Sequence, residues 1–187
     1  SPFLSNPNLK EIVFEEGLTT LPRYLFTGVT SLEEIILPEG IVTVGQDVFN
    51  GCSNVKKITF PDSLQTIGID AFKGLNQLTE LEFASGLITI NDGAFNGCTS
   101  LKKVTFSDSI TVIGSNAFNG APIEDLRLPA NVRELGKSAF SGNPNLTTVT
   151  LPKTLNSISW YGSPFLSNPN LKEIVFEEGL TTLPRYL

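Results

Sequence analysis

The sequence predicts a repeat solenoid: a right-handed coil of short turns, stacked so that one strand from each turn joins a parallel sheet along one face. Three observations support this prediction. Apolar residues recur along the whole chain with a period of about 23 residues. Each period contains one short alternating apolar segment, which is typical of a strand, and phenylalanine returns at fixed places in the period. Such periodicity indicates a stack of similar units, each contacting only its neighbours.

The strand segment opens each period with the pattern L-x-x-I-x-F-P or a close variant. In I-x-F or I-x-L, two side chains point inward and the residue between them faces outward. Apolar residues at L-x-x-L-x-L spacing in a period of 20–29 residues are the signature of a leucine-rich-repeat solenoid. We therefore expect a single array of about eight coils over residues 1–187. Its strand segments open at Leu9, Leu32, Val55, Leu78, Leu101, Ile123, Leu146 and Leu171.

Phenylalanine marks the part of each coil that closes the core. Eight phenylalanines share one repeat position and five share the second inward strand position, which places all 13 in the chain. A side chain repeated in every coil is typical of a core ladder, although such a stripe can also serve as a ligand platform. The first set is Phe3, Phe26, Phe49, Phe72, Phe95, Phe118, Phe140 and Phe165, and the second is Phe14, Phe60, Phe83, Phe106 and Phe176.

The two cysteines follow the same repeat. Cys52 and Cys98 each lie three residues after a ladder phenylalanine, a position that Val29 and Leu75 hold in other coils. Because they are two coils apart, their thiols would be separated by about 10 Å, beyond the Cα distance of about 4.4–6.8 Å that a disulfide requires. We expect free, buried thiols.

Composition excludes several classes of function. The chain has no histidine, which is the usual general base and the commonest metal ligand. Its 13 Lys+Arg against 19 Asp+Glu give a net charge of −6, and the absence of a basic cluster argues against nucleic acid as a partner. No apolar run approaches the roughly 20 residues of a membrane-spanning helix. We expect no enzymatic activity, no cofactor and no metal site.

The repeat unit resembles a known family. Units such as LKKVTFSDSITVIGSNAFNGA (Leu101–Ala121) are similar to the BspA-like leucine-rich repeats, and the similarity covers essentially the whole chain. It rests on the I-x-F-P strand, the I-G-x-x-A-F segment and the following G-C, seen in Ile58–Pro61, Ile67–Phe72 and Phe49–Cys52. The resemblance implies an extracellular or cell-surface protein that binds other proteins, such as host matrix or cell-surface proteins, and it supplies no catalytic motif.

The outward strand positions are the first candidate binding surface. Charge alternates down one outward column from Glu34 to Asp125, which fits either a register-fixing ladder of ion pairs or a partner surface. In the middle column, exposed aliphatic residues bordered by carboxylates would suit a basic amphipathic or extended partner. The candidate residues on this surface are Glu11, Val13, Glu34, Ile36, Glu80, Glu82, Arg127 and Val175.

The enlarged seventh repeat is the second candidate. Its two extra residues fall in the segment 159–163, which contains the only tryptophan, Trp160, and Tyr161. Insertions in repeats map to surface loops, where Trp and Tyr are favoured interface anchors. The alternative is that Trp160 packs back over the gap made by the extra turn.

The two ends of the chain carry the same sequence. SPFLSNPNLKEIVFEEGLTTLPRYL occurs as residues 1–25 and again, letter for letter, as residues 163–187. The sequence shows no atypical polar capping unit, so we expect an uncapped fragment of a longer protein and head-to-tail self-association of its end coils. Taken together, the sequence predicts a non-enzymatic extracellular protein-binding or adhesion module, with a structural spacer or self-assembling surface-layer solenoid as the alternative.

Overall fold

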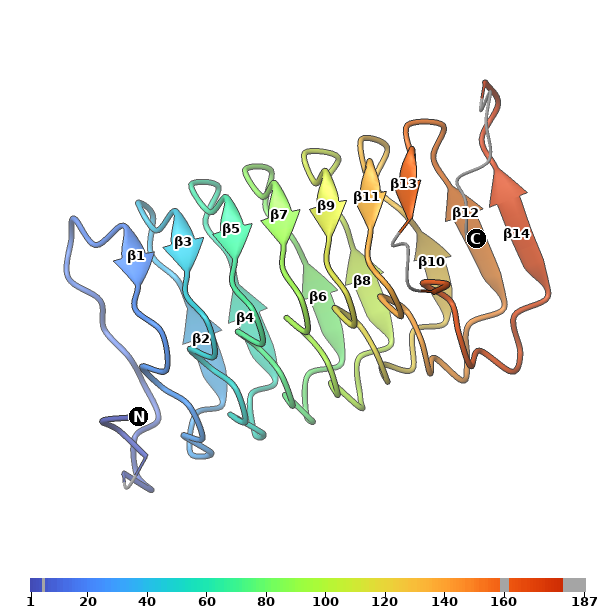
Figure 1. Ribbon diagram of the computed structural model, residues 1–187. Helices are drawn as coiled ribbons and strands as arrows, with labels where there is room; N and C mark the ends of the chain where they lie inside the picture. Colours follow the sequence, from blue (N-terminus) through green and yellow to red (C-terminus); the bar gives the residue numbers. More distant parts are fainter. Residues whose placement is uncertain (5, 159–161, 180–187) are drawn as a thin grey trace.

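The computed structural model describes residues 1–4, 6–158 and 162–179. These residues form a β-solenoid whose coils stack into an elongated rod, with β1 and β14 near opposite ends (Figure 1). Equivalent strands recur at the spacing of the sequence repeat, so the predicted solenoid and its period are confirmed. Nowhere in the described ranges is there a helix with the length and apolar character needed to cross a membrane.

One side of the rod, which we call the broad face, carries the strands that the sequence predicts. Parallel pairing places Lys57 beside Glu34 and Thr148 beside Asp125, so each residue lies next to its counterpart one repeat later. Seven of the eight expected segments form strands, whereas residues 9–14 of the first coil do not. The strands are β2 (Glu34–Ile36), β4 (Lys57–Thr59), β6 (Glu80–Glu82), β8 (Lys103–Thr105), β10 (Asp125–Arg127), β12 (Thr148–Leu151) and β14 (Glu173–Phe176).

The structure adds a second sheet, the narrow sheet, where the sequence analysis expected a single sheet face. Seven two-residue strands of the described residues, from successive coils, join into one parallel sheet. The coils approach closely here: a Cβ on Gly68, just after β5, would lie 2.6 Å from the carbonyl carbon of Gly45. Glycine therefore permits the backbone contact that brings these strands together. The strands are β1 (Thr20–Leu21), β3 (Thr43–Val44), β5 (Thr66–Ile67), β7 (Thr89–Ile90), β9 (Val112–Ile113), β11 (Glu134–Leu135) and β13 (Ser157–Ile158).

A continuous stack of phenylalanine rings runs through the core beside the narrow sheet. The ring centroids of Phe49, Phe72 and Phe95 follow one another at 5.3 Å, with ring planes within 11° of parallel. The core-ladder interpretation is therefore confirmed for the interior coils. It fails at the two ends of the described array, where Phe3 is 37% exposed and Phe176 is 41% exposed. Both lie in end coils, so one side of each lacks a neighbouring coil.

Candidate interaction face

The broad face presents the outward residues that the sequence analysis singled out. In β2, β6 and β10 the first and third residues are exposed and the middle residue is buried, as a half-buried strand requires. Ile36 is 57% exposed, and Val13 in the first coil is 86% exposed. Val175 is 38% exposed but lies in β14, at the other end of the rod, so the three aliphatic residues do not form one contiguous strip.

The hydrogen-bond ladder of the broad face is interrupted. Its strands form three separate sheets, β2–β4, β6–β8 and β10–β12–β14, although the narrow sheet runs unbroken through the same coils. In the described part of the chain, no main-chain hydrogen bond joins β4 to β6. The interior contact persists, since the rings of Phe60 and Phe83 stack at 5.5 Å beneath this boundary. The main-chain polar groups of β4 and β6 that point toward this boundary are therefore not bonded to one another.

Three hollows lie on the broad face where neighbouring strands are not paired. The first, of about 360 Å³, lies between the first coil and β2 and is lined by Glu11, Glu34 and Ile36. The second, of about 300 Å³, lies between β4 and β6 and is lined by Glu80 and Glu82. The third, of about 460 Å³, lies between β8 and β10 and is lined by Arg127. The structure thus distributes these six predicted site residues among three successive hollows.

Lysines complete the lining of these hollows. Lys57 lines the second hollow, and Lys103 lines both the second and the third. Both lie in the outward column whose charge alternates from Glu34 to Asp125, but neither is among the site residues predicted from the sequence. No residue pattern in the sequence marks the strand interruptions that make them part of a hollow.

The predicted ladder of ion pairs forms only in part. Lys57 Nζ lies 2.8 Å from a Glu34 carboxylate oxygen. Over the described residues of this column, no other neighbouring pair comes within ion-pair distance. Beside the column, Lys56 Nζ lies 2.9 Å from Glu33, and the hydrogen bond and charge of this lysine lower the pKa of the Glu33 carboxyl. Glu80 and Lys103 thus remain available to charged groups of a partner.

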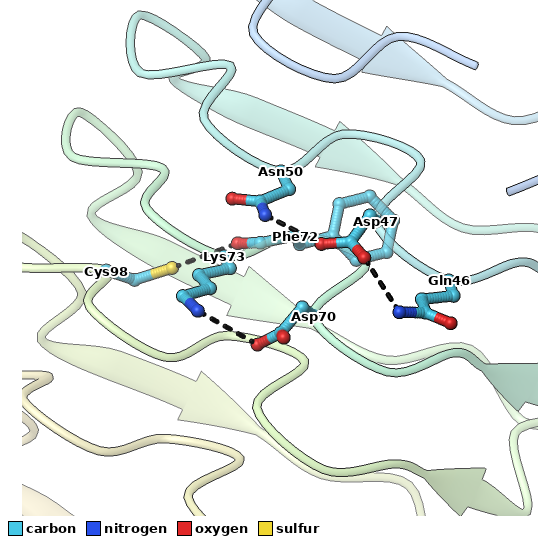
Figure 2. A network of polar contacts seen from close by, with 7 residues as sticks. All are labelled: Gln46, Asp47, Asn50, Asp70, Phe72, Lys73 and Cys98. Atoms are coloured by element: carbon cyan, nitrogen blue, oxygen red, sulfur yellow. Dashed lines mark hydrogen bonds and ion pairs between the residues drawn. The ribbon is translucent and has the colours of Figure 1, made fainter. Parts of the chain in front are cut away.

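A polar network at the turn after the narrow sheet is structural (Figure 2). Asp47 has a positive φ of 55° and accepts hydrogen bonds from Asn50 Nδ2 at 2.7 Å and Gln46 Nε2 at 3.0 Å. One coil further, Lys73 Nζ lies 3.4 Å from the Asp70 carboxylate. In these contacts, the polar side chains of each turn bind one another within the same coil. In the described ranges, no three acidic or thiol side chains gather as a metal would require.

Both cysteines are buried and free, as predicted. The Cys52 thiol donates to the carbonyl oxygen of Phe26 at 3.2 Å, and the Cys98 thiol donates to that of Phe72 at 3.4 Å. Burial raises the pKa of each thiol to about 12. A thiol with so high a pKa is a poor nucleophile near neutral pH. The second candidate surface, with Trp160 and Tyr161, lies outside the described residues.

Comparison with known proteins identifies the repeat. The family described as "BspA type Leucine rich repeat region" matches residues 1–91 and 65–187, in six copies. The leucine-rich repeat protein of T. pallidum (TpLRR) is 31% identical, over 78% of this chain and 68% of that protein, with a TM-score of 0.70. A leucine-rich repeat protein from Bacteroides ovatus is 25% identical, over 86% of this chain and 44% of its own length, with a TM-score of 0.73.

Curated proteins gave no match to the chain. The family match nevertheless extends from the first residue to the last, and its repeat is the unit seen in the solenoid. The chain belongs to the BspA-type leucine-rich repeat family.

Proposed function

We propose that this chain is a non-enzymatic, extracellular protein-binding module that uses the broad face for adhesion to matrix or cell-surface proteins. The supporting observation is that interruptions of the broad-face ladder coincide with hollows lined by exposed charged residues. A repeat needed only for spacing has no use for such a pattern. Membership of a repeat family supports a binding role rather than a catalytic one.

The chemistry of the hollows indicates the kind of partner. Each hollow contains both acidic and basic side chains, such as Glu80 beside Lys57 and Lys103 in the second. The main-chain groups of β4 and β6 offer further donors and acceptors there. Successive hollows are two coils apart, which corresponds to about 10 Å along the rod. An extended segment that places polar or charged side chains at this spacing would fit, with Ile36 as an apolar contact near its end.

Surface substitutions test this proposal. The intact chain is passed over a panel of immobilised extracellular-matrix proteins and over whole cells, beside Ile36→Glu, Lys103→Glu and Trp160→Ala variants whose folding circular dichroism has verified. Ile88→Glu is the matched control, since Ile88 is 42% exposed next to the narrow sheet. We expect Ile36→Glu or Lys103→Glu to weaken binding at least about tenfold, or about 1.4 kcal/mol, and Ile88→Glu to leave it unchanged.

Two results would contradict the proposal. One is no saturable wild-type binding to any member of the panel, and the other is an equal loss in the Ile88→Glu control. A loss confined to Trp160→Ala would move the binding site to the enlarged seventh repeat.

A second candidate function is a self-assembling or spacer solenoid. Its supporting observation is the regular stacking of the coils, in which the seven strands of the narrow sheet pair without a break. A spacer would tolerate substitutions on the broad face, whereas an assembling solenoid would respond to changes in its end coils.

A further inference from the structure

The three hollows recur at a fixed step along the broad face. The first lies between the first coil and β2, the second between β4 and β6, and the third between β8 and β10. Successive hollows are two coils apart, which corresponds to about 9.6 Å, because neighbouring parallel strands lie about 4.8 Å apart. A partner that lies along the rod therefore meets a hollow at regular intervals, and the outer two hollows are about 19 Å apart.

An aromatic ring lines each of the two outer hollows. Phe14 lines the first hollow and Phe106 lines the third. They hold the same repeat position four coils apart, and Phe106 is only partly buried. Phe60 and Phe83 hold this position in two of the coils between them but are buried. Among the described residues that line the second hollow, none has an aromatic ring. The row of hollows therefore has an aromatic ring at each end and none in the middle.

The outer hollows also differ in charge. The first is lined by three carboxylates and one ammonium group, those of Glu11, Glu33, Glu34 and Lys10. The third is lined by three basic and two acidic side chains, those of Lys102, Lys103, Arg127, Glu124 and Asp125. The first hollow therefore favours a basic side chain of a partner, and the third favours an acidic one.

Each outer hollow keeps a charge that no ion pair engages. The carboxylates of Glu33 and Glu34 are paired with lysines of the next coil, and Arg127 Nη2 lies 3.6 Å from the carboxylate of a glutamate just after β14. In the described ranges, neither Glu11 nor Lys102 has an oppositely charged group within ion-pair distance. Both side chains are exposed. Glu11 and Lys102 are therefore available to a charged partner in the first and third hollows.

A polyproline II helix has nearly the same step as the hollows. It has three residues per turn and rises about 3.1 Å per residue, so every third side chain faces the same way at intervals of about 9.3 Å. Over two steps it departs from the hollows by about 0.6 Å. An α-helix, in which side chains seven residues apart are separated by about 10.5 Å, departs by about 1.8 Å. Residues on the same side of a β-strand are only about 6.8 Å apart. Among these regular conformations, polyproline II fits the hollows most closely.

The unpaired main chain of the broad face favours the same conformation. A polyproline II segment has no internal hydrogen bonds, so its carbonyl groups remain free to accept hydrogen bonds from a partner. An α-helix has already used most of its own. At the second hollow, in the described part of the chain, the main-chain groups of β4 and β6 are not bonded to one another. Polyproline II segments also bind to grooves lined with aromatic rings, such as those of Phe14 and Phe106.

We infer that the broad face binds a polyproline II segment of a partner protein, which lies along the rod. A basic side chain of the segment enters the first hollow, a polar side chain the second and an acidic side chain the third, six residues from the basic one. Intervening prolines pack on Phe14 and Phe106. The inference rests on the broad face as the binding surface of the proposed function, and it specifies the conformation and the charge order of the partner.

Fluorescence anisotropy of labelled peptides, titrated with the intact chain, tests this inference. The probe is PPRPPQPPEPP, in which arginine, glutamine and glutamate recur at every third residue. Two control peptides carry the same charges. PPPPREQPPPP has the same composition but adjacent charged residues, so it cannot reach both outer hollows, and GGRGGQGGEGG has the same spacing in a flexible chain. We expect saturable binding of the probe and at least about fivefold weaker binding of each control.

Charge reversal provides a second measurement. Glu11→Lys should weaken binding of the probe at least about fivefold and should bind PPEPPQPPEPP more tightly than wild type does. Lys102→Glu should likewise weaken binding of the probe and favour PPRPPQPPRPP. A misfolded variant would bind no peptide, so a reversed preference reports recognition of charge. Arg133→Glu is the matched control, since Arg133 is exposed just before β11 of the narrow sheet, and it should bind every peptide like wild type.

Three results would overturn the inference: no saturable binding of the probe, binding of either control peptide as tight as that of the probe, or a charge-reversal variant whose peptide preference does not change. The inference and the proposed function fail separately. Matrix binding that Lys103→Glu weakens, without binding of the probe, would refute only the polyproline II partner. Binding of the probe, without binding to any matrix protein or cell, would refute only the adhesion proposal.

Discussion

The narrow sheet and the broad face differ although the same coils build both. The narrow sheet has strands of only two residues, yet all seven pair without a break. The broad face has strands of three or four residues, yet they separate into three sheets. Beside the narrow sheet, glycines such as Gly68 allow the coils to approach closely, and the rings of Phe49, Phe72 and Phe95 stack at an equal spacing. Uniform packing on one side of a repeat therefore leaves the other side free to vary.

The largest expected loss in the free energy of unfolding comes from disrupting the phenylalanine stack beside the narrow sheet. Phe72 is fully buried between Phe49 and Phe95, so Phe72→Ala should lower the free energy of unfolding by about 3–5 kcal/mol. Ile69, three residues earlier, is 45% exposed, and Ile69→Ala should cost less than about 1 kcal/mol. Urea unfolding followed by circular dichroism gives both values. Similar losses in the two variants would show that the phenylalanine stack is not what holds the coils together.

The buried cysteines beside the phenylalanine stack predict how the free energy of unfolding depends on pH. Burial raises the pKa of both thiols from 9.0 to about 12 in the folded chain. Above pH 9 the unfolded thiols lose protons that the folded ones keep. The contribution of each protonated, buried thiol to the free energy of unfolding is therefore fully present below pH 9. As the pH rises toward 12, the free energy of unfolding falls by up to about 1.4 kcal/mol per pH unit for each thiol.

The repeat itself supplies the control for this alkaline loss. The control is the double variant Cys52→Val, Cys98→Leu. Valine and leucine already occur at this repeat position in other coils, as Val29 and Leu75. Urea midpoints measured across the alkaline range should fall less steeply in this variant than in wild type. Equal slopes would mean that the two thiols do not titrate differently in the folded and unfolded chains.

The smallest expected effect lies on the broad face. Lys57 and Glu34 form an ion pair in which the side chains are 70% and 43% exposed. Lys57→Gln should therefore change the free energy of unfolding by less than about 1 kcal/mol, and by less still at high salt. The measurement is the same urea titration at two salt concentrations. A loss approaching that of Phe72→Ala would show that the broad face supports the fold as much as the narrow sheet does.

The sequence predicted the parts of the fold that depend on period alone. A constant repeat length determines which side chains stack, so the Phe72 stack, the buried Cys52 and the outward Glu34 all lie where the repeat places them. It did not predict the narrow sheet, because a strand of two residues is too short to show alternation. Nor did it predict the hollows, because the bonding of neighbouring strands depends on small shifts between coils. The interior positions expected for Phe3 and Phe176 were wrong, because full burial of a ladder ring requires a coil on both sides.

The interrupted ladder also has a mechanical consequence. In a solenoid, the hydrogen bonds between strands run along the rod axis, so they carry the load when the rod is stretched or bent. Here one edge is bonded in every coil and the opposite edge only in some. We expect such a rod to have a stiff edge and a compliant edge, and to bend most easily at the β4–β6 and β8–β10 boundaries. A ligand bound at those boundaries would push the neighbouring strands apart or hold them together, and would thereby change the curvature of the array.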